Sequence, residues 1–170
     1  MLTFLFPAGI FLLIAALYIL VPPFFGPPSV PTRHERIRKA LQLAKLKPNE
    51  TLYDLGAGDG RVLVIAAKEF EAQTVGVEIG PVQCAVSWLN AIWNGAKSKV
   101  KIEARNFYHT DISQADVIFA YLTSDQAVRL QEKIKRELKS GARVVTISFN
   151  FPDWEPVYLD RENLIFLYEK

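Results

Sequence analysis

The sequence predicts an α/β fold, a doubly wound sheet of seven strands preceded by one N-terminal transmembrane helix. Three observations support this prediction. Short apolar runs alternate with amphipathic stretches from residue 51 onward, as in strand–helix–strand units. A glycine-rich run, 53–61, lies between the first of these strands and the first helix after it. No charged side chain occurs before Arg33.

The chain opens with an apolar run, residues 4–21. A bilayer needs roughly 20 such residues. A cleaved signal peptide would have basic residues before its apolar core and small residues at its cleavage site, and this segment has neither. A buried core helix would be amphipathic or have polar flanks. We therefore expect residues 1–21 to be a single transmembrane anchor.

Basic residues crowd the segment 33–47, six of them against one acid, Glu35. The positive-inside rule then predicts a single-pass membrane protein whose folded domain, 32–170, lies on the cytoplasmic side. A solvated helix face is the alternative explanation of these charges. The anchor would make the lipid bilayer one partner of the chain.

A proline-rich linker, 22–31, joins the anchor to the domain and predicts a semi-rigid extended spacer. Thr32 is expected to cap the helix that follows, with Glu35 completing a capping box. This helix should end near Pro48. Its apolar face comprises Ile37, Ala40, Leu41 and Ala44.

The rest of the domain alternates between strands and helices. Helices are predicted over 62–70, 81–94 and 124–139, the last capped by Ser124. The connection 107–115 is too short for a full helix. Strands are predicted at 51–55, 74–78, 100–105, 116–122 and 143–149, with two closing strands near 157–160 and 164–169.

The spacing G-x-G-x-G, at Gly56, Gly58 and Gly60, follows the first strand directly after Asp54. Without a Cβ the backbone can turn sharply and approach a ligand, and the N–H groups of the next helix face the same place. A dinucleotide site would instead show G-x-G-x-x-G and a pyrophosphate, which a nearby carboxylate repels. The pattern therefore favours S-adenosylmethionine, with its ammonium and sulfonium, over NAD. An ordinary tight turn is the alternative.

Further polar and aromatic residues follow the next two strands. Glu78 ends the second strand, where its carboxylate can accept both hydroxyls of a ribose. Asn106 and Phe107 end the third, where an amide can bond adenine and a ring can cover it. A turn residue and a core phenylalanine are the alternatives. Because the carboxyl ends of parallel strands share one edge of the sheet, we expect one nucleoside site there.

Aromatic side chains follow the fourth and fifth strands: Tyr121, then Phe149 and Trp154. Rings close to a transferred methyl group would form a cage for an amine through cation–π contacts. Packing in the core is the alternative.

Composition excludes several other classes of site. One cysteine, Cys84, and two separated histidines leave no disulfide framework and no metal-ligand spacing, so no metal is expected. Neither a Walker loop nor a G-x-S-x-G elbow is present. From residue 48 onward 17 acids outnumber 14 basic residues, so a nucleic-acid partner is not expected.

These motifs resemble a known family. The chain is similar to the small seven-strand, class I (Rossmann-like) protein lysine methyltransferases, which include the archaeal broad-specificity enzyme and the mitochondrial enzymes for the adenine nucleotide translocase and the ATP synthase c-subunit. The mitochondrial members also begin with an apolar segment. Gly80 departs from the pattern, where the family has Asn or Asp. The resemblance covers nearly everything from Val30 and is carried by 30–32, 53–61, 75–79, 106–107, 137–145 and 149–156.

The resemblance implies a methyltransferase that uses S-adenosyl-L-methionine to methylate lysine side chains of proteins at or near the membrane. Two alternatives stay open: a small-molecule or lipid methyltransferase, acting for example on quinone or phospholipid precursors, and a non-catalytic membrane-anchored scaffold. The amine would be held by Tyr121, Phe149 and Trp154. The cofactor would be held by Thr32, Asp54, Gly56, Ala57, Gly58, Gly60, Glu78, Ile79, Asn106 and Phe107.

Overall fold

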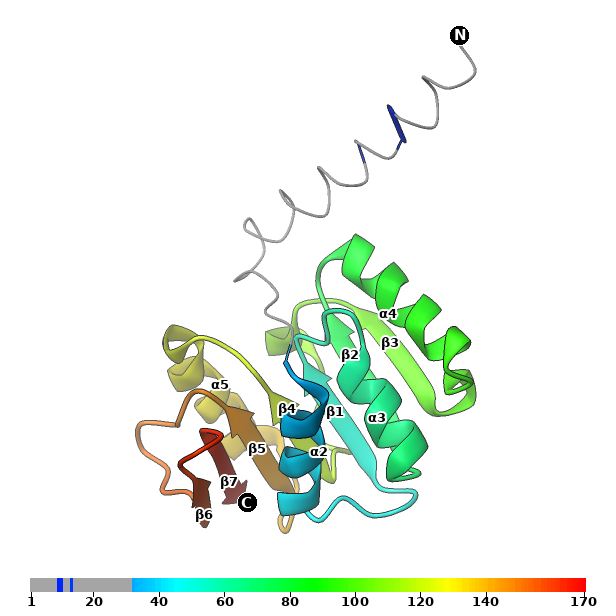
Figure 1. Cartoon of the computed structure of the whole chain (residues 1–170). Coiled ribbons are helices and arrows are strands. Elements are labelled where there is room, and N and C mark those ends of the chain that lie inside the picture. The colour runs from blue at the N-terminus through cyan, green and yellow to red at the C-terminus, as the bar shows by residue number, and fades with distance from the viewer. Residues whose placement is uncertain (1–8, 11–12, 14–31) are drawn as a thin grey trace, which may run out of the picture.

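A seven-stranded sheet forms the centre of the computed structural model, which describes residues 9–10, 13 and 32–170 (Figure 1). The strand order is β3-β2-β1-β4-β5-β7-β6. The first five strands run parallel, and β7 is antiparallel to both β5 and β6. The predicted doubly wound sheet is thus confirmed. The strands are β1 (Thr51–Leu55), β2 (Gln73–Glu78), β3 (Val100–Ala104), β4 (Val117–Ala120), β5 (Arg143–Ile147), β6 (Tyr158–Asp160) and β7 (Ile165–Glu169).

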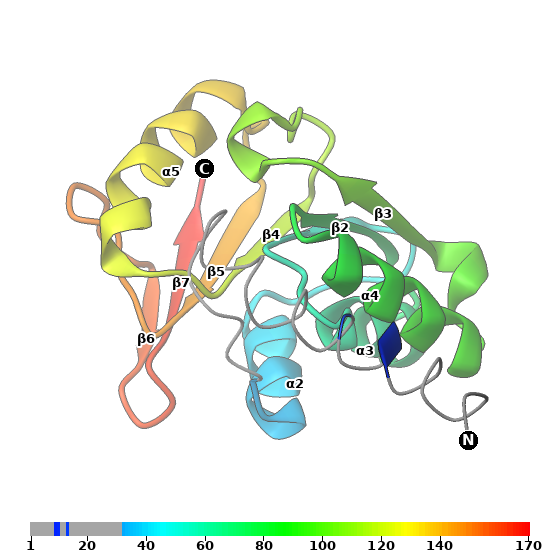
Figure 2. The same cartoon turned by 90° about the horizontal axis from the view of Figure 1, so that it is seen from above.

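Helices cover both faces of this sheet, as Figures 1 and 2 show. On one face lie α2 (His34–Leu43), α3 (Arg61–Glu69) and α4 (Pro81–Trp93). On the other lies α5 (Ser124–Glu137). Two 3₁₀ turns, η2 (Lys97–Lys99) and η3 (Phe107–His109), flank β3. Strand order reverses between β1 and β4, the place where doubly wound sheets bind their ligands.

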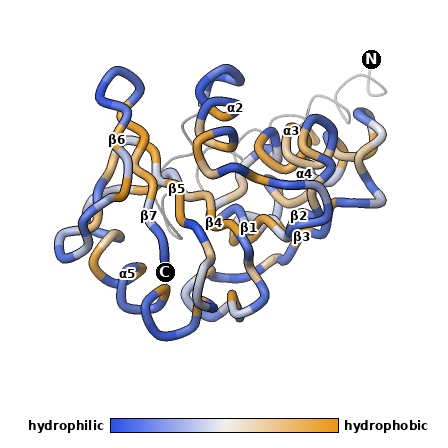
Figure 3. The backbone as a smooth tube through the Cα atoms, turned by 90° about the horizontal axis from the view of Figure 1, so that it is seen from below, coloured by the Kyte–Doolittle hydropathy of each residue, from blue (hydrophilic) through white to orange (hydrophobic). Residues whose placement is uncertain are grey.

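The core is divided by the sheet into two layers, because successive strand residues point to opposite faces. In β4, Val117 and Phe119 pack with α2 and α3, whereas Ile118 and Ala120 pack with α5. Figure 3 shows the hydrophobic residues concentrated along the central strands and the hydrophilic ones along the outer turns. The predicted apolar face of α2 is fully buried in the first of these layers: Ile37, Ala40, Leu41 and Ala44.

Two predicted helix caps are wrong. The N-cap of α2 is Arg33, in extended conformation and without a side-chain hydrogen bond, rather than Thr32 in a capping box. The reason is that the Thr32 carbonyl is held by the side chain of Arg61, which fixes the chain two residues before the helix begins at His34. The N-cap of α5 is Thr123 rather than Ser124, because Gln126 completes a capping box with Thr123.

Strands β4 and β5 end two residues earlier than the sequence suggests, at Ala120 and Ile147. At the β5 end, Ser148 adopts a φ of 64°, in the left-handed region that non-glycine residues rarely occupy. This conformation stops the strand ladder. Tyr121 and Phe149 therefore lie in loops at the carboxyl edge of the sheet rather than within strands.

The predicted anchor, 1–21, and linker, 22–31, lie outside the described residues apart from positions 9, 10 and 13. In the described part of the chain, no helix is both long and apolar enough to cross a membrane. The predicted single-pass membrane location is therefore corrected, and no such location is assigned. That prediction rested on the apolar composition of 4–21 alone.

Candidate functional site

The glycine-rich loop between β1 and α3 lies at the carboxyl edge of the sheet. Gly56, Gly58 and Gly60 have φ angles of 93°, 55° and 77°, which glycine adopts readily and other residues rarely. The N–H groups of Gly56 and Ala57 donate to the carbonyl of Val77 in β2, at 2.8 and 3.1 Å. The loop is thus a sharply turned backbone cradle anchored to the neighbouring strand.

Helix α4 packs directly against this loop. A Cβ on Gly60 would lie 2.2 Å from the Ser87 Oγ and 3.0 Å from the Ser87 Cα. A Cβ on Gly80 would lie 2.1 Å from Gln83 Oε1. The Gln83 side chain thus occupies the space beside Gly80, the position at which the chain departs from the family pattern.

Glu78 ties the end of β2 to the loop. Its Oε2 accepts from the N–H of Gly58 at 2.9 Å. Its Oε1 accepts from the N–H groups of Ile79 and Gly80, at 2.9 and 2.8 Å. A carboxylate offers about four acceptor positions, so a ligand hydroxyl can still be accepted beside these three donors. The predicted ribose-binding carboxylate therefore lies against the glycine loop.

Asp54 is the buried acid of the site, with 3% of its surface exposed. In the described part of the chain no hydrogen bond reaches its carboxylate. Burial, followed by repulsion from Glu78 and Asp59, raises the pKa of Asp54 to about 8. The carboxyl group is therefore mostly protonated at neutral pH without a ligand, and a bound cation would favour its ionised form.

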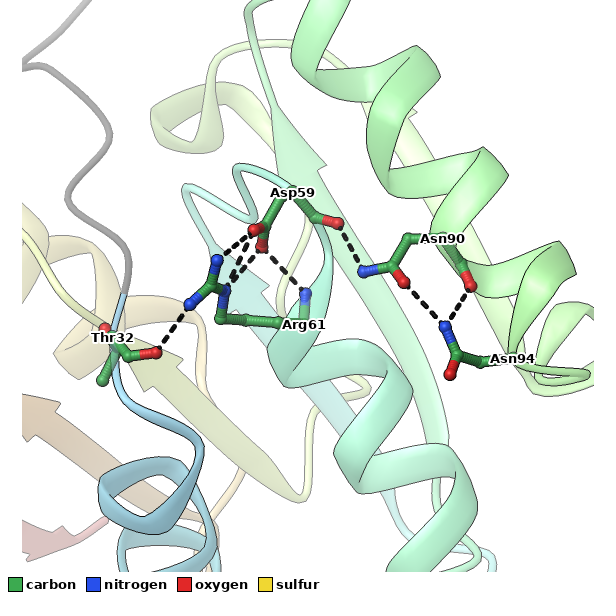
Figure 4. A network of polar contacts seen from close by, with 5 residues as sticks. All are labelled: Thr32, Asp59, Arg61, Asn90 and Asn94. Atoms are coloured by element: carbon green, nitrogen blue, oxygen red, sulfur yellow. Dashed lines mark hydrogen bonds and ion pairs between the residues drawn. The ribbon is translucent and has the colours of Figure 1, made fainter.

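A polar network holds the loop from both sides (Figure 4). Arg61 donates from Nη1 to the Thr32 carbonyl, at 2.9 Å, and forms an ion pair with Asp59. The backbone carbonyl of Asp59 in turn accepts from Asn90 Nδ2 of α4, at 3.0 Å. Asn94 Nδ2 donates to Asn90. The predicted site residue Thr32, which is buried, thus lies beside the glycine loop through a backbone contact.

The end of β3 brings Asn106 and Phe107 to the same edge. Arg105, the residue before Asn106, donates its N–H to the carbonyl of Glu78, at 2.9 Å. Asn106 Oδ1 accepts from the N–H of Tyr108, at 3.0 Å, and so caps the η3 turn. Phe107 is half-buried, with its ring centroid 4.4 Å from that of Tyr108. The chain is thus tied to Glu78 at Arg105, directly before the two residues, and the amide oxygen of Asn106 already has a structural role.

The structure does not bring the three predicted cage residues together. Phe149 and Trp154 belong to the core layer on the α5 side, linked through Phe151, whose ring centroid is 5.6 Å from each of theirs. Tyr121 packs on the opposite, α2 side. Among the described residues no ring contact joins Tyr121 to the other two. Tyr121 thus packs with a different core layer from Phe149 and Trp154.

A cavity of about 730 Å³ opens beside Tyr121 on the α2 side. Pockets of roughly 300–1,000 Å³ are typical of small-ligand sites. Because Thr32 lines the cavity and is bonded by Arg61, the cavity adjoins the glycine loop. Sequence reasoning missed most of its lining, since α2 and the β6–β7 turn are far apart along the chain. The lining residues are Thr32, Arg33, Glu35, Arg36, Tyr121, Ser148, Glu162, Asn163 and Leu164.

A family profile and the sequences of known proteins both point to one family of methyltransferases. The profile of the "ANTKMT methyltransferase domain" matches residues 54–158. A protein-lysine N-methyltransferase of Saccharolobus islandicus (strain REY15A) is 38% identical over 130 residues, covering 76% of this chain and 81% of its own length. The lysine N-methyltransferase for the ATP synthase c-subunit of Homo sapiens is 28% identical over 159 residues, covering 89% and 67%.

A solved methyltransferase structure shares the fold of this chain. An RNA methyltransferase from Salinibacter ruber, in complex with S-adenosyl-L-homocysteine, is 31% identical with a TM-score of 0.80, covering 82% of this chain and 93% of that one. The site fits S-adenosylmethionine, because a backbone cradle, the carboxylate of Glu78 and a buried acid without a partner among the described residues share one edge. The predicted resemblance is confirmed: the chain belongs to the ANTKMT methyltransferase domain family and is an S-adenosylmethionine-dependent methyltransferase.

Proposed function

We propose that this methyltransferase modifies the side-chain amine of lysine residues in proteins, and that the lysine enters the cavity beside Tyr121. The observation that carries the proposal is the position of this cavity. It lies at the carboxyl edge of the sheet, where acceptors meet the cofactor in doubly wound folds, and it shares Thr32 with the glycine-loop network. Relatives named as protein-lysine methyltransferases support the choice of acceptor.

On this proposal, the chain divides cofactor binding among a few groups. Asp54 would bind the ammonium of the methionine part, the backbone of 56–60 would pass beside it, and Glu78 would accept the ribose hydroxyls. Asn106 and Phe107 would contact adenine. When bound, S-adenosylmethionine supplies an electrophilic methyl group on a sulfonium.

The cavity would prepare the acceptor amine. A lysine ammonium has no lone pair, and its pKa in solution is about 10.4. Removal from water favours the neutral amine, as does the sulfonium cation of the bound cofactor. The charges of the lining itself are balanced, since Arg33 and Arg36 are matched by Glu35 and Glu162. Solvent can take the proton, and holding the neutral amine in line with the methyl group supplies much of the rate.

Lysine is preferred over RNA as the acceptor on grounds of charge. RNA-binding surfaces are rich in basic residues that contact phosphate. Over the whole domain, 32–170, 20 basic residues stand against 18 acids, so there is no strong basic excess, and the cavity itself is lined by two arginines and two glutamates. The location of the target protein at or near a membrane stays a prediction.

The proposal is tested by transfer of tritiated methyl from S-adenosylmethionine into a cell extract, using the full chain. Mass spectrometry should place the label on lysine side chains of proteins, and S-adenosylhomocysteine should suppress it. Label confined to RNA, lipid or small-molecule fractions would contradict the proposal, as would a complete absence of transfer by protein that binds the cofactor.

Replacement of Glu78 by alanine is expected to weaken cofactor binding by about 10- to 100-fold, because it removes a charge-assisted pair of hydrogen bonds. It also releases the N–H groups of Gly58, Ile79 and Gly80, so a lower melting temperature should accompany the loss. Calorimetry of S-adenosylhomocysteine binding measures the effect. The matched control is Glu132→Ala, an exposed carboxylate on α5. Unchanged affinity in folded Glu78→Ala would remove Glu78 from the site.

A further inference from the structure

Arg36 of α2 connects three segments that are remote along the chain. Its Nε donates to the carbonyl of Asn163, at 2.6 Å, and its Nη2 donates to the Ser148 Oγ, at 2.9 Å. Its guanidinium carbon lies 5.8 Å from the centre of the Tyr121 ring. That distance is within the range of cation–π attraction. One half-buried side chain therefore contacts the end of β4, the end of β5 and the β6–β7 turn.

These contacts surround the proposed acceptor cavity. Arg36, Tyr121, Ser148 and Asn163 all line it. The loops that follow parallel strands have no ladder partners of their own, so side chains must fix their positions. Here one guanidinium does so for two strand ends and a turn.

The backbone at Ser148 shows that this arrangement is held against a local preference. Its φ of 64° lies in the left-handed region. For a residue with a Cβ, that conformation costs roughly 1–2 kcal/mol. The Ser148 N–H donates to the carbonyl of Leu164, at 2.9 Å, and its hydroxyl accepts from Arg36. Such conformations persist only where surrounding contacts hold them, and they cluster at functional sites.

The turn that carries Asn163 is itself built around a buried acid. Asp160 accepts from the N–H groups of Glu162 and Asn163, both at 3.1 Å, and pairs with Lys39 of α2 at 2.7 Å. Helix α2 therefore contacts the turn at two points one helical turn apart, Lys39 and Arg36. Lys39 binds Asp160 at the start of the turn, whereas Arg36 binds the carbonyl of Asn163, which lines the cavity.

We propose that Arg36 is a positioning residue for the acceptor: it holds Tyr121, Ser148 and Asn163 in the arrangement that aligns the incoming amine. The inference rests on the proposed function, because it assigns the cavity to the acceptor. The planar guanidinium makes two divergent hydrogen bonds and faces an aromatic ring at once, which the single ammonium of lysine cannot reproduce.

The test compares Arg36→Lys and Arg36→Ala with the same changes at Arg38, an arginine of the same helix that pairs instead with Glu69 of α3, at 2.8 Å. Both Arg36 variants should raise the KM for the lysine acceptor about tenfold. Neither should change the Kd of S-adenosylhomocysteine by more than about twofold. A general loss of folding would instead lower the fraction of protein that binds S-adenosylhomocysteine. The Arg38 variants should leave both constants unchanged. An unchanged acceptor KM in folded Arg36→Lys would overturn the proposal.

Hydrogen exchange gives a readout that does not depend on turnover. Exchange in the segments around Tyr121, Ser148 and Asn163 should rise together in Arg36→Lys and stay unchanged in Arg38→Lys. If the wild-type protein methylates no lysine, the proposed function fails. The exchange measurement still tests whether Arg36 holds the three segments in place. A change at only one segment, or at none, would overturn the positioning role whatever the acceptor.

Discussion

Replacement of Asp54 by asparagine is expected to stabilise the ligand-free protein at pH 8 and to weaken cofactor binding. The pKa of the folded Asp54 is raised from 3.8 to about 8, chiefly by burial. The folded state therefore holds a proton that the unfolded chain has lost, and stability falls as pH rises between these values. Each pH unit in that window costs at most about 1.4 kcal/mol. Asparagine removes this pH-dependent cost.

The effect on binding should have the opposite sign. The ligand ammonium favours the ionised carboxylate, so binding to wild type below pH 8 should release a proton and strengthen as pH rises. The amide of the Asp54→Asn variant carries no charge, and a lost charge-assisted bond predicts an affinity about 10- to 100-fold lower. Calorimetry in two buffers of different ionisation enthalpy measures the released proton directly.

Asp153→Asn is the control, since Asp153 is an exposed acid on the loop after β5. It should match the wild type in melting temperature between pH 6 and 8 and in cofactor affinity. An Asp54→Asn protein that is less stable than the wild type at pH 8, or that binds the cofactor equally well, would contradict the role of Asp54 as an acid held neutral for a cation.

Replacement of Gly60 by alanine is expected to destabilise the fold more than alanine at two other glycines with positive φ. Gly60, Gly95 and Gly141 have φ angles of 77°, 66° and 78°. All three substitutions place a Cβ in the left-handed region, at roughly 1–2 kcal/mol. Only at Gly60 does the new Cβ also meet a neighbour, at 2.2 Å from the Ser87 Oγ and 3.0 Å from its Cα, whereas the other two face open space.

Overpacking of this kind typically adds about 1–3 kcal/mol. Urea unfolding should therefore show a loss of about 2–5 kcal/mol for Gly60→Ala against about 1–2 kcal/mol for Gly95→Ala and Gly141→Ala. Adding Ser87→Ala should restore part of the loss, because it removes the nearest atom while the Ser87 backbone stays. Equal losses at the three glycines would show that α4 does not press on the loop as closely as the structure indicates.

The meeting of the glycine loop and two acids at one edge of the sheet was predictable because each lies next to a strand in the sequence. Asp54, the glycines and Glu78 each sit at the end of a strand that its apolar run reveals, and parallel strands bring those ends to one edge. The lining of the cavity beside Tyr121 was less predictable. Arg36 and Asn163 lie 127 residues apart, and no periodicity connects them.

The aromatic residues show a second limit. Tyr121 follows the alternation of β4 and packs in the same layer as Phe119, but Phe149 leaves the layer of Ile147, because the left-handed Ser148 before it interrupts the alternation of β5. To predict which layer each ring joins, one would have to know the last residue of each strand, and the sequence pattern does not show it that closely. The capping role of Thr32 failed for a related reason, since a tertiary bond from Arg61 competes with the local motif.

Whether methyl transfer to lysine takes place at the cavity beside Tyr121 can be decided by comparing two aromatic substitutions. The measurement is kcat/KM for lysine methylation by Tyr121→Leu and Trp154→Leu, each with S-adenosylhomocysteine affinity measured alongside. We expect Tyr121→Leu to lower kcat/KM about tenfold or more at unchanged cofactor affinity, and Trp154→Leu to have the smaller effect. A full loss in Trp154→Leu with normal activity in Tyr121→Leu would place the acceptor on the α5 side of the sheet and contradict the proposed site.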